Sequence, residues 1–243
     1  MSNRKRIATW SMALATVVSA ALLVAASPSE PPVGADTPKP AANRFTGDPY
    51  PLETCIVSGE KFSGTDQPVT KVYDEREIRF CCKGCSREFE RDQAKYIAKI
   101  DEQIIASQLA HYPLKTCVVM EEDSLEEGSP VNVVYGNRLV RFCCNDCVKK
   151  FKADPAKYLA KLNKAVIDQQ KSIYPLDTCA MSGEKLGEDS VDRVHGVTLI
   201  RFCCKRCEAR FAINPLPVMA KVHQAWAAKH KAADDPHAGH DHH

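Results

Sequence analysis

The feature that most constrains this chain is a string of six residues that occurs three times. It reads Phe-Cys-Cys-x-x-Cys, and a Tyr-Pro-Leu-x-Thr-Cys string precedes each copy. Together the two strings hold all twelve cysteines, and the first cysteines of successive copies are 62 residues apart. This fixed period predicts three small units instead of one or two ordinary domains. A unit this short has little core, so it usually needs a metal ion, disulfides or a neighbouring unit for stability.

The N-terminal segment has the pattern of a secretory signal. Three basic residues, Arg4 to Arg6, precede an apolar run, Ile7 to Ala26, which has small residues near its end. The run approaches the length that spans a bilayer, so an uncleaved membrane anchor is the alternative. The following segment is rich in Pro and Ala, which is typical of a disordered leader. We therefore predict these segments: signal peptide 1–26, disordered leader 27–49, repeats 50–111, 112–173 and 174–232, and a His-rich tail 233–243.

The signal predicts an exported protein, periplasmic or in the cell envelope, with no membrane span once the signal is cleaved. Removal of residues 1–26 takes three of the 33 basic residues and none of the 31 acidic ones, leaving 30 basic residues against 31 acidic. A near-neutral chain gives no reason to expect nucleic-acid binding. Export also makes disulfides a competing interpretation, because an even number of cysteines outside the cytosol usually pairs.

Each repeat shows the same local patterns in the same order. A turn follows the first cysteine, and then come a polar loop and two short alternating stretches that predict a β-hairpin. We expect the hairpin turns at residues 74–75, 136–137 and 196–197. In the second strand the apolar residues share one face, and we place the arginines on the solvated face: Arg79, Arg141 and Arg201.

Two helices should follow each hairpin. The first begins at the cysteine pair and carries a phenylalanine four residues after the last cysteine, over the core. Asp154-Pro155 and Asn214-Pro215 mark a second start, whereas Asp92-Gln93 in the first repeat predicts a softer one. The second helix has apolar residues at helical spacing and reaches nearly to the next repeat. The fold class is therefore α+β: three tandem small units joined by helices.

The cysteine spacing points to metal ligands, although the pattern departs from a common zinc site. Such a site takes two ligands from a Cys-x-x-Cys knuckle and two from a helix start. Here the second knuckle position is Ser58, Met120 or Ser182, so one ligand is missing from every repeat. The other end has one cysteine too many. Either three thiols bind and the additional thiol lies close by, or all four thiols coordinate one ion.

The helix start favours a thiolate, because its free amide groups and dipole lower the thiol pKa. A three-thiolate site suits a soft ion such as Cu(I), or a Zn(II) ion that can be passed on. The Met120 thioether could be a Cu(I) ligand; the alternative is a methionine packed in the small core. The disulfide alternative pairs, for example, Cys55 with Cys85 and leaves Cys81 and Cys82 adjacent, and a switch between metal and disulfide states is also open.

The C-terminal tail ends in a histidine tract interrupted by Gly and Asp, and tracts of this kind bind divalent metals. The candidate metal ligands are therefore the cysteines, one methionine and four histidines: Cys55, Cys81, Cys82, Cys85, Cys117, Cys143, Cys144, Cys147, Cys179, Cys203, Cys204, Cys207, Met120, His237, His240, His242 and His243.

The stretch from Arg141 to Phe151, followed by Asp154 to Leu159, resembles the TRASH and YHS metal-binding domains. The resemblance extends over all three repeats and implies treble-clef-like units that bind a metal ion, without naming the ion. Two features depart from that pattern: a longer loop before the second cysteine, and the additional cysteine. The ligands that the resemblance implies are Cys55, Cys81 and Cys85; Cys117, Cys143 and Cys147; and Cys179, Cys203 and Cys207.

We expect an exported protein that binds copper or zinc, as Cu(I) or Zn(II), at about one ion per repeat, for buffering, trafficking or resistance. Its partner would be a metal-transport protein or another exported protein. Two alternatives remain open: an interaction module stapled by structural zinc, and a thiol redox protein. We do not expect an enzyme, since the sequence has neither a phosphate-binding loop nor a zinc-hydrolase motif.

Overall fold

The computed structural model describes residues 47–63 and 67–233. The predicted signal peptide, most of the predicted leader and the His-rich tail lie outside these residues. The predicted leader ends at residue 49, but Asp48 and Pro49 are buried. Within the described residues, no helix is both long and apolar enough to cross a membrane.

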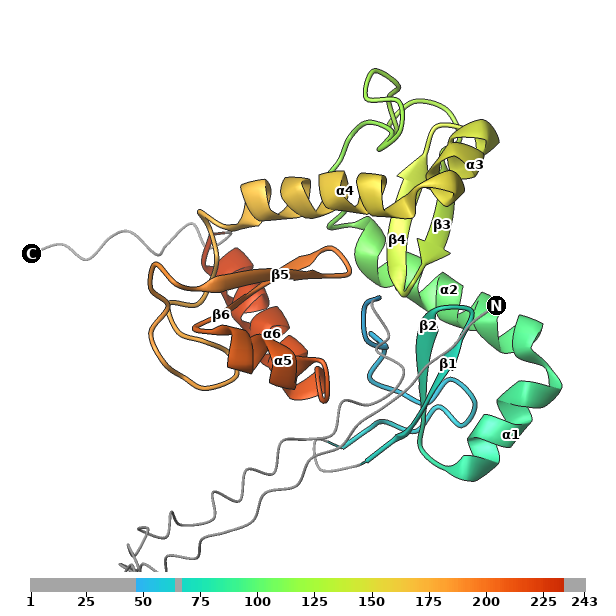
Figure 1. Cartoon of the computed structure of the whole chain (residues 1–243), viewed down its shortest axis with the longest axis horizontal. Helices are drawn as coiled ribbons and strands as arrows, with labels where there is room; N and C mark the ends of the chain where they lie inside the picture. The colour runs from blue at the N-terminus through green and yellow to red at the C-terminus, as the bar shows by residue number, and fades with distance from the viewer. Residues whose placement is uncertain (1–46, 64–66, 234–243) are drawn as a thin grey trace, which may run out of the picture. The chain divides into compact units, whose positions relative to one another are not determined.

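The described part of each repeat, here called units 1, 2 and 3, contains an antiparallel hairpin followed by two helices (Figure 1). Unit 1 has β1 (Val69–Tyr73), β2 (Arg76–Phe80), α1 (Lys83–Arg91) and α2 (Gln93–Leu109). Unit 2 has β3 (Val131–Tyr135), β4 (Arg138–Phe142), α3 (Asn145–Ala153) and α4 (Pro155–Gln170). Unit 3 has β5 (Val191–His195), β6 (Thr198–Phe202), α5 (Lys205–Phe211) and α6 (Leu216–Ala233). The described residues thus form a mixed α+β structure with six helices and three two-stranded hairpins, as predicted.

The hairpin turns lie where the sequence predicts them. In unit 1 the two turn residues are Asp74 and Glu75, with φ angles of 46° and 61°. Gly136, Asn137 and Gly196 also have positive φ angles, of 53°, 68° and 58°. Left-handed backbone suits a two-residue hairpin turn, because its twist matches that of the paired strands. Glycine adopts this conformation without a steric cost, whereas Asp74 and Glu75 adopt it against their ordinary preference.

A pair of phenylalanines forms the centre of each core. The ring of Phe80 at the end of β2 lies 5.3 Å from that of Phe89 in α1, and both side chains are fully buried. The equivalent pairs in units 2 and 3 have ring separations of 5.3 and 5.5 Å. This confirms the predicted place of the second phenylalanine. Burial of such a ring contributes about 2–3 kcal/mol, so the pair fixes the helix start against the strand end.

The second helix begins in the same way in units 1 and 2. The side chain of Asp92 accepts a hydrogen bond from the Lys95 amide at 3.3 Å, and Asp154 accepts one from the Lys157 amide at 3.2 Å. The prediction of a softer start in unit 1 is therefore wrong. An aspartate that caps the new helix is sufficient to separate the two helices, with or without a following proline.

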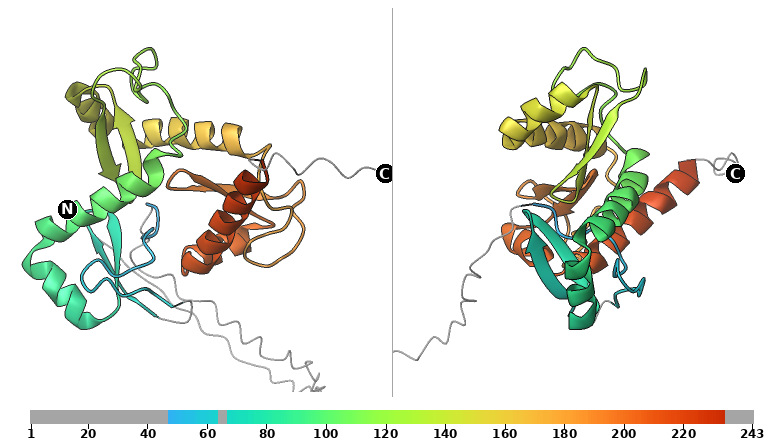
Figure 2. Two further views of the ribbon diagram at one scale, coloured as in Figure 1. Left: turned by 180° about the vertical axis from the view of Figure 1, so that it is seen from behind. Right: turned by 90° about the vertical axis from the view of Figure 1, so that its right-hand side faces the viewer.

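Each of the first two units contacts the next through the end of its second helix. α2 packs on β3 and β4, and α4 packs on β5 and β6 (Figures 1 and 2). The Gln108 amide donates to the Asn137 carbonyl at 3.2 Å and accepts from the Leu139 amide at 2.9 Å. The side chain of Gln170, at the end of α4, makes the two equivalent bonds to unit 3: it donates to the Val197 carbonyl at 2.8 Å and accepts from the Leu199 amide at 2.7 Å. One glutamine at the same place in two repeats therefore holds the next hairpin.

A second set of contacts joins the units at their hairpin turns; it is here called the junction and comprises Asp48, Asn137, Arg138, His195 and Gly196. Arg138 pairs with both carboxylate oxygens of Asp48, at 2.8 and 2.9 Å, and the Gly196 amide donates to Asp48 at 2.8 Å. The side chain of Asn137 accepts from Arg76 at 2.7 Å and donates to the Glu77 carbonyl at 2.8 Å. The junction thus links all three units, which fall in one compact part of the chain.

The sequence predicted that the strand arginines lie on a solvated face, and this prediction is wrong. Arg79 is 3% exposed and its guanidinium lies 2.7 Å from Glu77. Arg141 and Arg201 are half-buried and lie over the rings of Tyr112 and Tyr174, at 5.6 and 6.0 Å. The prediction failed because the alternating pattern identifies two faces of a strand but not what covers the second one.

Candidate metal centres

The first cysteine of each unit begins a tight turn. In unit 1 the Cys55 amide donates to the Glu60 carbonyl, and the Gly59 amide donates back to the Cys55 carbonyl, both at 2.8 Å. Unit 3 has the same pair of bonds. The turn of unit 2 is one residue longer, and the Cys117 amide donates to the Asp123 carbonyl at 2.8 Å. This arrangement directs the first cysteine of every unit toward the hairpin.

The other cysteines lie where a strand changes into a helix. Cys81 directly follows β2, Cys82 has extended backbone at the residue before α1, and Cys85 is in the first turn of that helix. Cys82 has φ −154° and ψ 168°, and the equivalent residues Cys144 and Cys204 have nearly the same angles. The first of the two adjacent cysteines, at the end of the strand, lies in the same cluster as the turn cysteine.

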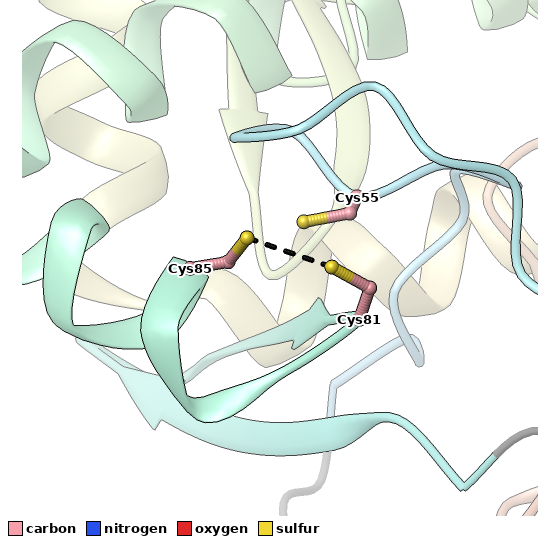
Figure 3. A group of neighbouring side chains, drawn as sticks. All are labelled: Cys55, Cys81 and Cys85. Atoms are coloured by element: carbon pink, nitrogen blue, oxygen red, sulfur yellow. Dashed lines mark hydrogen bonds between the residues drawn. The ribbon is translucent and has the colours of Figure 1, made fainter.

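Three thiols in each unit come together. Their sulfur atoms lie within 4.8 Å of one another in three groups: Cys55, Cys81 and Cys85; Cys117, Cys143 and Cys147; Cys179, Cys203 and Cys207. Figure 3 shows the three side chains of unit 1, whose sulfur atoms point toward one another. We call these groups the triads. They contain the nine cysteines that the resemblance implies as ligands.

The spacing of the sulfur atoms can be compared with that around a metal ion. The strand-end and helix sulfur atoms lie 3.5 Å apart in unit 1, 3.6 Å in unit 2 and 3.7 Å in unit 3. Around a tetrahedral zinc ion with bonds of about 2.3 Å, two sulfur atoms are about 3.8 Å apart. A disulfide would need about 2.05 Å. All twelve cysteines are free thiols in this structure, and the triads have the spacing of metal ligands.

Each triad has a buried side and a more open side. Cys55, Cys117 and Cys179 are fully buried, and they belong to the apolar clusters around the phenylalanine pairs. The strand-end cysteines are only half-buried. The core therefore surrounds the first cysteine of every unit, and in units 2 and 3 the helix cysteine as well, while the strand-end side remains nearer to solvent.

The first cysteine is the most acidic of each triad. Burial opposes ionisation of Cys55, but hydrogen bonds from the Ser58 hydroxyl and from backbone amides of the turn lower the pKa of its thiol to about 7. The same groups act on Cys179, where the Ser182 hydroxyl takes part and the pKa is again about 7. In Cys117 backbone amides of the turn outweigh burial and lower the thiol pKa. The turn thus favours the thiolate form of the first cysteine in every unit.

The helix thiols have the opposite shift. Burial, together with the thiols of Cys81 and Cys82, raises the pKa of Cys85 to about 12. In unit 2 burial is again the largest cause, and the pKa of Cys147 is about 11. Ionisation of a second thiol is unfavourable beside the first thiolate, because like charges at this distance repel. A bound cation would remove that penalty, since metal binding releases thiol protons.

The additional cysteine of each unit lies beside the triad, not within it. Cys82 and Cys144 are exposed and Cys204 is half-buried. The sulfur of Cys144 is 3.8 Å from that of Cys143, and Cys204 is 3.8 Å from Cys203. The backbone amide of the helix cysteine lowers the pKa of each of these outer thiols. Of the two arrangements that the sequence left open, the structure has three grouped thiols with a fourth one adjacent.

The second knuckle position differs among the units. The hydroxyl oxygen of Ser58 is 3.4 Å from the sulfur of Cys81, and Ser182 is 3.4 Å from Cys203. Met120 is 41% exposed, so the alternative of a methionine packed in the core is wrong. Its role as a Cu(I) ligand stays a prediction. His237, His240, His242 and His243 lie outside the described residues, and their predicted role in metal binding likewise stays a prediction.

Sequence reasoning missed two acidic residues next to the triads. The thiol of Cys143 donates to the Asp123 carboxylate at 3.1 Å, and the thiol of Cys203 donates to the Glu184 carboxylate at 3.0 Å. A pattern in the sequence could have identified them: each turn begins at the first cysteine of its unit and ends at an acidic residue.

Comparison with known protein families, with curated proteins and with solved structures finds no match to this chain. The similarity to TRASH and YHS domains therefore stays a resemblance of short motifs. The geometry supports a narrower conclusion: the chain contains three repeated triads of cysteines, one in each α+β unit, and each triad is close enough to hold one metal ion.

Proposed function

We propose that this protein binds soft or borderline transition-metal ions, Cu(I) or Zn(II), one in each triad, and holds them for buffering, trafficking or resistance outside the cytosol. The observation that carries the proposal is the recurrence of three thiols within 4.8 Å of one another in every unit. Thiolates are the ligands that soft metal ions prefer in proteins. The TRASH and YHS resemblance and the predicted signal peptide support the same function.

The arrangement favours an ion that can be exchanged. Structural zinc sites are closed by four protein ligands, whereas each triad supplies three thiols and has one side near solvent. An outer thiol lies 3.8 Å from the strand-end thiol in units 2 and 3. This thiol could hold an arriving or departing ion while one bond to the triad forms or breaks. The His-rich tail would add a first contact for divalent ions.

The test is metal analysis of the mature chain, residues 27–243, purified without oxygen. We expect about three ions of copper or zinc per chain and, after their removal, twelve titratable thiols. Replacing the first cysteine of all three units by serine should remove most of the metal. Replacing the three outer cysteines by serine is the matched control and should retain it. A wild-type protein that takes up neither ion and has twelve oxidised cysteines would refute the proposal.

A structural role for the metal is the second candidate, because units of about 60 residues have small cores. Circular dichroism before and after removal of the metal by a strong chelator separates the two functions. In the proposed function the helices persist without metal, since the phenylalanine pairs and the junction hold the units. In the structural alternative, removal of the metal unfolds them, as in zinc fingers.

The remaining alternative is thiol redox chemistry, favoured by the lowered pKa of the outer thiols. A disulfide-exchange assay with a small aromatic disulfide would detect it. The redox alternative requires rapid exchange that is lost in Cys82→Ser and in the equivalent variants, whereas the metal-binding function requires no catalytic exchange.

A further inference from the structure

One acidic residue occupies the same place in all three turns. The backbone carbonyls of Glu60, Asp123 and Glu184 accept the amide hydrogen of the first cysteine of their unit, at 2.8, 2.8 and 2.7 Å. The equivalence is hidden in the sequence, because the turn of unit 2 is one residue longer. The backbone bond brings each acidic residue to the rim of its triad.

Two of the three carboxylates contact a triad directly. An oxygen of Asp123 lies 3.1 Å from the sulfur of Cys143, and an oxygen of Glu184 lies 3.0 Å from that of Cys203. Around a tetrahedral zinc ion, a sulfur and an oxygen ligand are about 3.6 Å apart, given bonds of about 2.3 and 2.1 Å. Both side chains are exposed, so rotation about their own bonds is free to bring the oxygen over the open side of the triad.

The three units differ in what surrounds the strand-end thiol. In unit 1 this thiol contacts the Ser58 hydroxyl, and the hydrogen bonds described for Glu60 involve its backbone alone. In unit 3 the thiol contacts both the serine and the carboxylate of Glu184. In unit 2 Met120 occupies the position of the serine, and the strand-end thiol of Cys143 contacts the carboxylate of Asp123.

We propose that Asp123 and Glu184 supply the fourth ligand of the sites in units 2 and 3. These two sites would then present three sulfur atoms and one oxygen, while unit 1 presents three sulfur atoms. The inference rests on the proposed function and adds which ion each site prefers. Zn(II) accepts a carboxylate oxygen beside thiolates, whereas Cu(I) selects sulfur ligands. Units 2 and 3 are therefore sites for a divalent ion of the zinc type.

The experiment compares Zn(II) and Cu(I) affinities of the full mature chain by competition with chromogenic chelators. The variant is Asp123→Asn with Glu184→Gln, and the matched control is Glu122→Gln with Glu188→Gln. The control residues are exposed acids in the same two loops, and none of their described contacts is with a thiol. Circular dichroism checks that every variant keeps its helices.

We expect two of the three Zn(II) ions to bind about 100-fold more weakly in the variant, at the upper end of the effect of losing a group that supports a metal site. The Cu(I) affinity and the control should stay within about threefold of wild type. The remaining tight Zn(II) ion should be insensitive to Glu60→Gln.

The possible outcomes separate this inference from the proposed function. If wild type binds three ions and the variant binds Zn(II) as tightly as the control does, the inference is wrong and the function stands. Equal weakening of Zn(II) and Cu(I) would mean that the carboxylates act through charge, which also overturns the ligand role. If wild type binds no metal, the proposed function itself fails.

Discussion

The triads and the junction differ in how far along the chain their contacts reach. Each triad closes within one unit, between a turn, a strand end and a helix start, and it occurs three times. The junction occurs once and joins residues as far apart as Asp48 and Gly196. Its ion pair, Asp48 with Arg138, has side chains that are 6% and 8% exposed. A triad of thiols is therefore a property of the single unit, whereas the arrangement of the units depends on buried polar contacts.

Removing one member of the buried ion pair is the strongest test of the difference between the junction and the triads. Asp48→Ala leaves the Arg138 guanidinium buried without its partner, which should lower the free energy of unfolding by about 3–5 kcal/mol. Urea denaturation measures the loss. The metal content should remain three ions per chain, because no triad residue contacts Asp48.

The control for that change replaces both partners by apolar residues, Asp48→Leu with Arg138→Met. Part of the lost stability should return, because neither charge is then buried alone, while the Gly196 amide still lacks its acceptor. If Asp48→Ala also abolished metal binding at a temperature where the chain is folded, the triads would depend on the junction and the comparison would be wrong.

Acidic pH should weaken the junction through His195. Burial is the largest cause that lowers the pKa of this imidazole from 6.5 to about 4. Arg138, Arg193 and His223 also lower this pKa, whereas the Asp48 carboxylate raises it. The unfolded chain therefore binds a proton at a higher pH than the folded chain does. The contribution of neutral His195 to the free energy of unfolding is fully present above about pH 6.5. It is lost as the pH drops toward 4, by about 3 kcal/mol in total.

Urea denaturation between pH 7 and pH 4 measures this slope. His195→Leu should flatten it, since Phe211 already packs on the ring and the ring nitrogens have no hydrogen-bond partner among the described residues. Burial also lowers the pKa of His223, so His223→Gln is the control and should remove a smaller part of the slope. An unchanged slope in His195→Leu would show that this histidine is not the group responsible.

The two glutamines at the helix ends allow the contribution of each connection to be measured. Gln108→Ala removes the partners of the Leu139 amide and the Asn137 carbonyl and should cost about 1–3 kcal/mol, because a buried donor is left unsatisfied. Gln170→Ala should cost less, since Gln170 is only half-buried. The exposed Gln103 on the same helix as Gln108 is the control; its replacement by alanine should change stability by less than about 0.5 kcal/mol. Equal effects at all three positions would mean that the glutamines do not connect the units.

The smallest expected effect concerns the outer thiols. Replacing Cys82, Cys144 and Cys204 together by serine should change stability by less than about 0.5 kcal/mol, because these side chains are largely exposed. The metal content should be unchanged, and transfer of Cu(I) to a competing chelator should become slower. Loss of metal from the triple variant would show that four thiols, not three, form each site.

Much of the unit could be predicted from the sequence, because its contacts are local. The hairpin turn at residues 74–75, the helix cap at Asp154 and the phenylalanine pair of each core are determined by neighbours within about ten residues. A cluster of thiols in each repeat was also predictable, since a turn, a strand end and a helix start can meet in only a few ways, but the sequence left three and four coordinating thiols open. Two local details were missed. Asp123 and Glu184 were both overlooked, because an acidic residue in a polar loop has no distinct pattern and a one-residue insertion shifts Asp123 out of register with Glu184. The burial of Arg79 depends on Glu77 and on what covers the strand.

Local sequence patterns specify three repeated units, each with a knuckle-like turn, a hairpin, two helices and a set of thiols at the right spacing for a metal ion. These features arise from backbone preferences and side-chain periodicity, which act over short distances along the chain. Only the tertiary structure decided which thiols group and which one stays outside, which carboxylates reach the triads, and how Asp48, Asn137 and Arg138 join the units. Those outcomes depend on the burial of polar groups, and a buried charge or amide finds its partner wherever packing brings one, even 90 residues away.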